Sequence, residues 1–329
     1  MEAVWDFGLD VSRWLQETYP GQALFFSLIS DLGRFEFYLA ILPLIYWCLD
    51  KRLGTYLTYV LAFSDLLNAG VKHLTREPRP YWLDGRLQLS SEPTYGLPSA
   101  HAQSVVVAYV FLAAWLRRGW VWLLCLLMVI LTGLARLYLG VHFLHQVVAG
   151  FMLGILILLG FSVWERYLAQ SFVKRILGQR LLIVLLVPTV MAVLYTAGRL
   201  LVGAPDLAAT WNFYIPAAEQ ESLESVASGV GTLFGLGVGF VLERSRVRFV
   251  VAGPAWKKIL RYLLGIFVAL LIWRGLGIVF AVDLLWLAIP LRILRYLLLG
   301  LWAAYYAPML FVRLRLAQAN PEPEISLAL

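Results

Sequence analysis

Six residues with side chains suited to phosphate chemistry occur in a short stretch of an otherwise apolar chain. They are Lys72, Arg79, Ser99, His101, Arg136 and His142. A charged side chain at the centre of a bilayer costs roughly 2.5–3.5 kcal/mol on insertion scales. Lysine and arginine can hold a phosphoryl group together, and histidine exchanges protons near neutral pH. The set is therefore more typical of a functional site than of scattered charges.

Local sequence indicates how these side chains are presented. Pro78 and Pro80 flank Arg79, so a helix that carries Lys72 must end before them and continue as an extended loop. Ser99 is a good N-cap, and the first turn of the helix after it offers free N–H groups to an anion. Considered alone, Lys72 and Arg79 are also consistent with side chains that snorkel to a membrane boundary. His101 alone is also consistent with a histidine that caps a helix.

His142 and Gln146 are four residues apart and would share one face of a helix. The amide oxygen of Gln146 could then accept a hydrogen bond from one ring nitrogen of His142 and orient the other nitrogen outward. His145, three residues after His142, makes a metal-binding pair conceivable, but no Asp or Glu cluster accompanies it. We therefore predict no metal site.

The composition is that of a polytopic membrane protein. Of 329 residues, 61% are hydrophobic and 14% are charged, and the mean hydropathy is +0.78. A soluble domain has about 25% charged residues. The net charge of +7 is interpreted as positive loops on one side of a membrane, because nothing resembles a nucleic-acid-binding module. Cys48 and Cys125 lie in apolar segments and predict no disulfide.

Nine apolar segments predict an all-α bundle of membrane-spanning helices. They cover about 22–49, 53–74, 101–116, 119–139, 143–164, 181–203, 225–242, 259–281 and 284–312. The first is long enough to begin with a separate short helix. Residues 1–20 carry Phe7, Val11, Trp14 and Leu15 along one stripe, a pattern typical of an interfacial amphipathic helix. Gly231, Gly235 and Gly239 recur every four residues and predict a helix-packing face.

The distribution of Lys and Arg predicts the orientation in the membrane. Alternate connections carry more than half of the 27 Lys and Arg residues, namely those at 51–52, 117–118, 166–180, 244–261 and 313–315. The connection 204–224 contains four acidic residues and no Lys or Arg. The loop 75–100 and the turn between Arg136 and His142 are therefore expected on the non-cytoplasmic side, with the N-terminus outside.

The order K-x6-RP, PSxH and R-x5-H, from Lys72 to His142, resembles the type 2 phosphatidic acid phosphatase (PAP2) superfamily. The segment HFLHQVVAG resembles the third motif of its glucose-6-phosphatase branch, and dolichyl-diphosphatase-like members also have Gln at the position of Gln146. The resemblance implies a six-helix core, here followed by about three additional spans. The expected regions are an interfacial helix (1–20), a catalytic core (21–203) and additional C-terminal transmembrane helices (204–329).

The resemblance also implies roles for individual residues in a metal-independent hydrolysis of phosphate esters, with no cofactor. His142 matches the nucleophile that forms a phosphohistidine, and His101 matches the acid that protonates the leaving oxygen. Phosphate binding would fall to Lys72, Arg79, Ser99, Ala100 and Arg136. Such a reaction needs mainly positioning and charge stabilisation from the protein.

Three positions depart from the family pattern. Ala100 replaces a Gly, Ala135 replaces a Ser, and Gln146 replaces the Asp that usually orients the nucleophile. A neutral amide can hold one histidine tautomer, but it stabilises an imidazolium less than a carboxylate does. The departure at Gln146 therefore bears on the rate more than on the kind of reaction.

Several functions remain open at this stage. The leading expectation is a phosphatase for a membrane lipid phosphate or diphosphate, with Tyr81, Trp82, Tyr95 and Tyr138 as a lipid-facing surround. A sugar-phosphate phosphatase and a phosphotransferase are the alternatives within the same chemistry. A catalytically silent lipid binder or transporter is the alternative of another class, motivated by Ala100 and Gln146. The sequence leaves the oligomeric state open.

Overall fold

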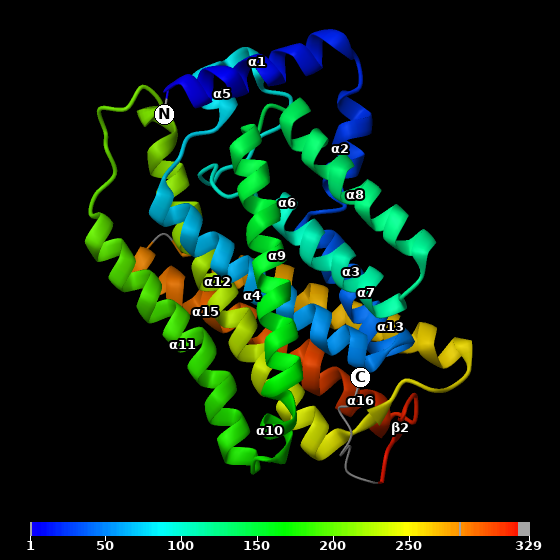
Figure 1. The fold of residues 1–329 in the computed structure, drawn as a ribbon. Helices are drawn as coiled ribbons and strands as arrows, with labels where there is room; N and C mark the ends of the chain where they lie inside the picture. The colour runs from blue at the N-terminus through cyan, green and yellow to red at the C-terminus, as the bar shows by residue number, and fades with distance from the viewer. Residues whose placement is uncertain (1, 283, 322–329) are drawn as a thin grey trace. The chain divides into compact units, whose positions relative to one another are not determined.

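The computed structural model describes residues 2–282 and 284–321, which are almost entirely helical (Figure 1). The all-α fold predicted from the sequence is confirmed. Residues 322–329 of the expected C-terminal region lie outside the described residues. The chain forms two compact units that interleave along the sequence: the first comprises residues 1–38, 64–159 and 195–225, and the second comprises 39–63, 160–194 and 226–329.

The first unit contains six whole helices and carries all the candidate site residues. These helices are α1 (Glu2–Thr18), α2 (Ala23–Asp31), α5 (Pro80–Leu83), α6 (Ala100–Val105), α7 (Phe111–Leu116) and α8 (Gly119–Tyr138). A π-helical segment, Val106–Val110, joins α6 to α7. Five further helices have residues in both units: α3 (Phe35–Leu44), α4 (Lys51–Thr75), α9 (Leu144–Tyr167), α11 (Leu177–Val202) and α12 (Ile215–Leu242).

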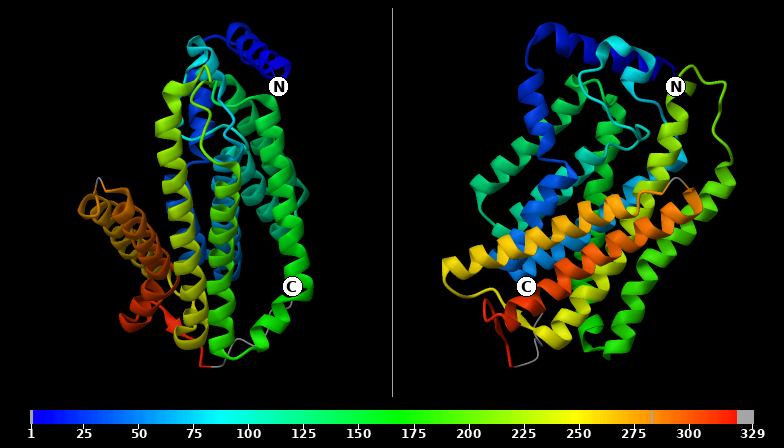
Figure 2. Two further views of the ribbon diagram at one scale, coloured as in Figure 1. Left: turned by 90° about the vertical axis from the view of Figure 1, so that its left-hand side faces the viewer. Right: turned by 180° about the vertical axis from the view of Figure 1, so that it is seen from behind.

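The second unit contains the remaining helices and one short pair of strands. They are α10 (Ala169–Lys174), α13 (Ala255–Leu270), α14 (Leu276–Val279), α15 (Leu285–Leu301), α16 (Ala307–Arg313), β1 (Phe249–Val250) and β2 (Gln318–Ala319). The two strands are antiparallel, with Phe249 opposite Ala319. Figures 1 and 2 show α13 and α15 side by side, and Ala269, Tyr296 and Leu299 form a small core where they pack.

Six of the described helices are long and apolar enough to cross a membrane. The pair α2 and α3, with the π-helical turn after it, would make a seventh span that is bent between residues 31 and 35. This bend confirms that the first apolar segment begins with a separate short helix. The other two expected spans, 53–74 and 101–116, are helical as well. They correspond to α4, which is not among the six, and to the apolar helix Ala100–Leu116, which is shorter than the six.

The predicted packing face of glycines is present in the second unit. A Cβ atom on Gly231 would lie 2.3 Å from the carbonyl oxygen of Ile293, and one on Gly235 would lie 2.2 Å from that of Leu297. A Cβ on Gly239 would similarly meet Ala304 at 2.6 Å. The small residues of α12 therefore allow α15 to approach its backbone directly.

Helix α1 has the amphipathic character expected for residues 1–20, but its apolar stripe divides in two. Leu15 is buried in the first unit, whereas Phe7 and Trp14 are 59% and 58% exposed. The Gln16 side chain donates to the carbonyl oxygen of Tyr138 at the end of α8, at 2.7 Å. Helix α1 is thus fixed to the first unit by one face and presents two large apolar side chains on another. Its interfacial role stays a prediction.

The aromatic residues expected to surround a lipid are instead part of the core. Tyr81, Trp82, Tyr95 and Tyr138 are all buried and belong to one hydrophobic cluster. The expectation that these rings face a lipid path is therefore wrong. Hydrogen bonds reduce the cost of burying their polar ends: the Tyr138 hydroxyl donates to the carbonyl oxygen of Tyr19, at 2.8 Å.

Close backbone approach joins the helices that carry the motifs. A Cβ on Gly150 would lie only 2.5 Å from the carbonyl oxygen of Ser99, so α9 can pass directly beside the start of α6. The Ser99 N–H donates to the Gln146 carbonyl oxygen at 3.0 Å. On the other side of α6, Asn68 of α4 donates to the Gln103 side chain at 2.7 Å. These contacts bring the three motifs into one place.

Candidate active site

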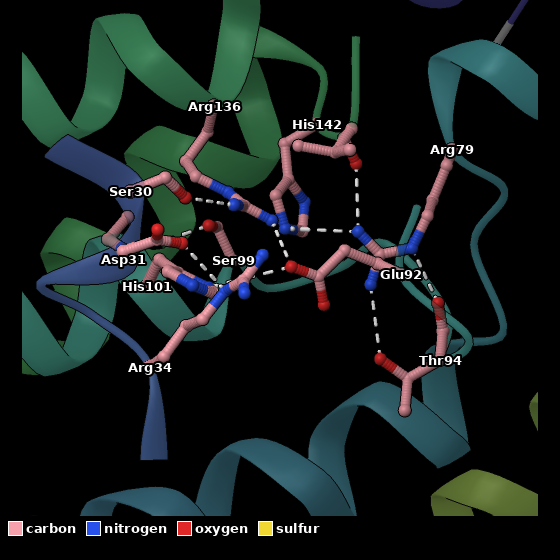
Figure 3. A network of polar contacts seen from close by, with 12 residues as sticks. Ser30, Asp31, Arg34, Arg79, Glu92, Thr94, Ser99, His101, Arg136 and His142 are labelled. Carbon is pink, nitrogen blue, oxygen red and sulfur yellow. Dashed lines mark hydrogen bonds and ion pairs between the residues drawn. The ribbon is translucent and has the colours of Figure 1, made fainter. Parts of the chain in front are cut away.

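The predicted site residues converge in the first unit, although they come from five different segments (Figure 3). Lys72 is in the last turn of α4, Arg79 precedes α5, His101 begins α6, Arg136 ends α8, and His142 precedes α9. Figure 3 shows the guanidinium groups of Arg79 and Arg136 reaching toward His142 and Glu92 from opposite sides. Most of these polar side chains are buried, which points to a built site rather than to a solvated surface.

Arg79 is held by carbonyl oxygens of two loops. Its Nε donates to the carbonyl oxygen of Thr94 at 2.5 Å, and its Nη1 donates to that of Val141 at 2.8 Å. A further bond from Nη2 to the Tyr95 carbonyl measures 3.0 Å. Burial lowers the pKa of Arg79 to about 10, and Glu92 opposes that shift. Arg79 therefore remains a fixed cation at neutral pH.

Thr94 links the two cations of the first motif. Its hydroxyl accepts from the Lys72 ammonium at 3.2 Å and from Arg79 Nη2 at 3.1 Å. Lys72 is only 5% exposed. Both charges therefore point into one buried space, as needed for two groups that bind the same phosphoryl oxygens.

Arg136 reaches the same space from α8. Its Nη1 donates to the Ser30 hydroxyl of α2 at 2.6 Å, and its Nη2 donates to the Glu92 carboxylate at 2.5 Å. Its Nε has no hydrogen-bond partner within the described part of the chain. The guanidinium therefore retains a donor that an incoming anion could use.

Glu92 occupies the centre of the cationic cluster, a feature that sequence reasoning missed. Besides its bond to Arg136, its carboxylate lies 3.9 Å from Nδ1 of His101. Burial alone would raise the pKa of Glu92, but Arg136, followed by His101 and Arg79, holds it well below its usual range. The Tyr81 hydroxyl fixes the Glu92 backbone by donating to its carbonyl at 2.7 Å. A charged carboxylate thus stands among the groups expected to bind phosphate.

His142 presents its two ring nitrogens to different partners. Nδ1 lies 3.1 Å from the amide oxygen of Gln146, as expected from the spacing, and Nε2 lies 3.2 Å from Nη1 of Arg79. An amide oxygen can only accept, so Nδ1 carries the proton. Nε2 is then unprotonated, and its lone pair accepts from Nη1 of Arg79 within the cluster of cations.

The orientation of the Gln146 amide follows from its other contacts. Its Nε2 lies 3.0 Å from a Glu77 carboxylate oxygen and 2.8 Å from the Pro78 carbonyl oxygen, and both of these groups are acceptors. Its oxygen also accepts from the Phe143 N–H at 3.2 Å. Reversing the amide would place a donor against Phe143 N–H and an acceptor against Glu77. The tautomer of His142 is therefore set by surrounding protein groups.

Electrostatics keep His142 neutral. Burial lowers the pKa of His142 well below its usual value, and the nearby cations, Arg79 first, lower it further. The neutral form, which carries the lone pair, is thus present above this lowered pKa and is lost only as the pH falls through it. At neutral pH, Nε2 of His142 is available as a nucleophile.

The PSAH segment forms the remaining wall. Ser99 is the N-cap of α6, where its hydroxyl accepts from the Ala102 N–H at 3.4 Å, and Ala100 is the first residue of the helix. His101 is mostly buried, with its side chain 11% exposed. Its Nε2 has no hydrogen-bond partner among the residues that the structure describes. The ring thus has Nδ1 3.9 Å from Glu92 and an unpartnered Nε2, which suits a group that contacts a substrate.

His145, the third histidine near the site, has a carboxylate partner. Its Nε2 lies 2.7 Å from Glu77. Within residues 2–282 and 284–321, no group of three His, Cys, Asp or Glu is placed to hold a metal ion. His145 therefore takes part in the contacts of Glu77 rather than in a recognisable ligand set.

Four contributing residues were not predicted: Ser30, Glu77, Glu92 and Thr94. A weak signal for the two acids does exist, because only three acidic residues, Glu77, Asp84 and Glu92, occur between Lys72 and His101. Two of them turn inward to the site. Asp84 instead pairs with Arg13 and with the exposed Arg86. The sequence contains no feature that separates these two behaviours, since both depend on the path of the loop.

Taken together, the site offers a neutral imidazole nitrogen, three cations and a second imidazole in a buried space. Such a set can bind a phosphoryl group by its oxygens, attack its phosphorus with Nε2 of His142 and donate a proton from another side. The described contacts provide the positioning that phosphoryl transfer requires.

Comparison with known protein families matches two regions of the chain. Residues 53–170 match the family described as the PAP2 superfamily. Residues 227–319 match the transmembrane extension of PAP2 superfamily phosphatases, and these all lie in the second unit. The first match contains all three motifs.

Similar curated proteins include phosphatases for lipid and for sugar phosphates. Lipid phosphate phosphatase delta of Arabidopsis thaliana is 31% identical over 41% of this chain and 36% of its own length. Glucose-6-phosphatase catalytic subunit 1 of Rattus norvegicus is 28% identical over 49% of this chain and 54% of its own. Phosphatidylglycerophosphatase B of Bacillus subtilis is 27% identical over 44% and 72%. The chain thus spans about a third to a half of the length of the first two.

Among solved structures, the chain is similar to a transmembrane PAP2-type phosphatidylglycerolphosphate phosphatase from Bacillus subtilis. The sequences are 23% identical, and the match covers 51% of this chain and 89% of that one, with a TM-score of 0.44.

Proposed function

The chain belongs to the PAP2 superfamily, and from this premise we propose that it is an integral-membrane phosphatase that hydrolyses a lipid phosphate or diphosphate through a phosphohistidine. One observation carries the proposal above all others. Nε2 of His142 faces Arg79 at 3.2 Å, while Nδ1 is held at 3.1 Å by an amide oxygen. The unprotonated nitrogen is thus directed at the cationic cluster.

The proposed reaction has two steps at one phosphorus atom. Lys72, Arg79 and Arg136 bind the phosphoryl oxygens, and Nε2 of His142 forms a bond to phosphorus as the bond to the leaving oxygen breaks. His101 donates a proton to that oxygen. The oxygen of a water molecule then forms a bond to phosphorus as the bond to Nε2 of His142 breaks, and the water gives a proton to His101, which restores the protonated His101 that donates in the first step. Inorganic phosphate leaves, and His142 returns to its neutral form.

The choice of a lipid substrate has support in α2. This helix supplies Ser30 to Arg136, yet Leu24 and Leu28 are 72% and 58% exposed. The helix that supplies Ser30 to the site thus also exposes apolar side chains, which the acyl or prenyl chains of a substrate could contact. Lipid phosphate phosphatase delta and sphingosine-1-phosphate phosphatase 1 are among the similar proteins.

A sugar phosphate is the second candidate. The observation that favours it is Glu92, whose carboxylate beside His101 could accept hydrogen bonds from hydroxyl groups. Glucose-6-phosphatase catalytic subunits of several mammals are among the relatives. A phosphotransferase would share the first step and differ only in the acceptor that replaces water.

We also propose that the site faces the non-cytoplasmic side. The connections at 117–118 and 244–261 are positively charged, which favours a cytoplasmic location for them. The site would then lie on the other side of the membrane. The loop that carries Arg79 and Glu92 follows the end of α4 and precedes α6, and it would therefore open outward.

The first prediction concerns phosphate release by the purified protein. Wild type should release phosphate in EDTA and lose this activity with vanadate, because the mechanism needs no metal and vanadate mimics the transferred group. His142→Ala should fall to background, and His101→Asn should lose roughly 100- to 10,000-fold, the usual contribution of an acid–base group. A panel of polyprenyl diphosphate, phosphatidic acid and a hexose phosphate distinguishes the substrates.

Two results would contradict this function. Equal inactivity of wild type and His142→Ala on every substrate of the panel would favour a silent lipid binder. Activity that requires an added divalent metal would exclude the proposed route. Brief reaction with a radiolabelled substrate should also trap an acid-labile, base-stable phosphoryl group on wild type and none on His142→Ala.

A further inference from the structure

Glu77 stands directly behind the group that orients His142. One carboxylate oxygen, Oε2, accepts from the Gln146 amide at 3.0 Å. The other, Oε1, lies 2.7 Å from His145 Nε2 and accepts from the Trp5 indole at 3.3 Å. Glu77 is only 5% exposed, so its carboxylate is held in one position by contacts on both oxygens.

The three side chains form a continuous chain of hydrogen bonds from Glu77 through Gln146 to His142. The Gln146 amide donates at one end and accepts from Nδ1 of His142 at the other, at 3.1 Å. Such an arrangement aligns the amide dipole with the carboxylate, because the NH2 group faces the negative charge and the oxygen faces the ring. Polarisation along the chain strengthens both bonds.

Phosphorylation of His142 would create a positive charge in this place. When Nε2 is bonded to phosphorus while Nδ1 keeps its proton, the ring becomes a cation. Arg79, Arg136 and Lys72 already disfavour a cation at His142. A neutral amide alone gives such a ring little stabilisation, so a negative charge at the far end of the amide would matter.

We propose that Glu77 is a positioning residue for His142, which fixes the Gln146 amide and stabilises the charged ring through it. The proposal rests on the phosphohistidine function proposed above. It explains how the chain can use Gln146 in place of a carboxylate. The negative charge is supplied by Glu77, in the loop before Arg79, and reaches His142 through the Gln146 amide.

The test compares Glu77→Gln with wild type in the purified full chain, using the substrate found by the panel. The variant keeps the shape of the side chain and removes its charge. We expect kcat to fall roughly 10- to 100-fold with KM within two-fold, since the lost interaction acts on the charged ring and not on substrate binding. Glu77→Asp, which retains the charge, should recover part of kcat.

A control variant separates this effect from loss of folding. Glu219→Gln removes a different carboxylate of the same unit, which bonds Arg76, Tyr95 and Arg199. Its hydrogen bonds within the described part of the chain do not include Gln146. Active sites are counted by titration with vanadate. Both variants can lose active sites, but only Glu77→Gln should lose kcat per site.

A double substitution tests whether changes at Glu77 and Gln146 compensate each other in kcat. In the wild-type background, Gln146→Asp would place a second carboxylate against Glu77, and two buried carboxylates repel each other. With Glu77→Gln in addition, the introduced carboxylate can accept from His142 without that repulsion. The double variant should therefore have a higher kcat than either single variant. A purely structural role for Glu77 would make the two losses add.

The possible failures are distinguishable. If Glu77→Gln retains kcat per site within two-fold while His142→Ala is inactive, the role of Glu77 is refuted and the phosphatase function stands. If the loss appears only in KM or in the number of sites, the role of Glu77 is likewise refuted. If wild type forms no phosphoenzyme and His142→Ala matches its activity, the proposed function fails, and the inference about Glu77 fails with it.

Discussion

At the scale of single residues, the site is an arrangement of opposite charges in a buried space. Arg79 and Arg136 would repel each other without a negative charge between them, and Glu92 supplies that charge in the structure. A phosphoryl group carries the same sign and uses the same donors. Glu92 and the substrate must therefore share Arg136 or compete for it, and the carboxylate lowers the affinity of the site for anions.

This competition leads to a prediction for Glu92→Gln. Removing the negative charge should lower the inhibition constant of inorganic phosphate by about ten-fold. Repulsion between a buried carboxylate and a bound anion weakens binding by about that factor. The measurement is competitive inhibition of phosphate release. Asp84→Asn is the matched control, since Asp84 is an ionised acid of the same loop that pairs with Arg86 and Arg13.

The competition hypothesis requires a decrease only in the Glu92 variant. An unchanged or higher inhibition constant in Glu92→Gln would mean that Glu92 mainly orients Arg136. An equal decrease in Asp84→Asn would instead indicate a general effect of loop charge on anion binding.

At the scale of elements, the site depends on loops that pass close to helix ends. Gly96 shows this in the loop between α5 and α6. A Cβ atom there would lie 2.4 Å from the Gln146 amide nitrogen and 2.6 Å from the Pro78 carbonyl oxygen. The Gly96 N–H also donates to the Glu77 carbonyl oxygen at 2.7 Å. The loop can close over Gln146 only because this position has no side chain.

Gly96→Ala should therefore displace the Gln146 amide and disorient His142. We expect a loss of kcat of at least about ten-fold, since neither the amide nor the carbonyl can move without breaking a buried hydrogen bond. The assay is phosphate release per vanadate-titrated site. Gly85→Ala in the same loop is the control, because a Cβ at Gly85 meets no atom within 4 Å. Similar losses in both variants would argue against the stated contact.

At the scale of the whole molecule, the arrangement of charges predicts which loops face outside. Arg86 lies in the loop that covers the site, and its side chain is 84% exposed. Arg118 lies between α7 and α8 and is also exposed. These two residues belong to connections of opposite predicted side, so they report the orientation directly.

The prediction is tested with Arg86→Cys and Arg118→Cys in intact cells that express the full chain. A membrane-impermeant maleimide should label the first variant and should label the second only after the cells are permeabilised. The native Cys48 and Cys125 are both buried, which keeps the background low. The reverse pattern would place the site on the cytoplasmic side and would falsify the proposed localisation.

The helical fold and the residue types of the site could be predicted from the amino-acid sequence. Apolar segments of span length leave few alternatives to helices, because a bilayer offers no partner for free backbone groups. The prolines around Arg79 and the N-cap at Ser99 are local signals, and the structure has the predicted end of α4 and start of α6. The expected extended loop is interrupted by the short helix α5, which begins at Pro80 because proline is favoured at the first position of a helix. The predicted hydrogen bond between His142 and Gln146 is present, although His142 lies in the turn before α9 and does not share a helix with Gln146.

The further groups that complete the site follow from the packing of distant segments. Glu92 meets Arg136 across 44 positions of sequence, and Glu77 meets Gln146 across 69. Nothing local separates these two acids from Asp84, which turns away. The burial of the aromatic residues that were expected around a lipid likewise depends on contacts between distant segments. Contacts between distant segments depend on how loops pack against helix ends, and helical periodicity and local capping signals do not encode that packing.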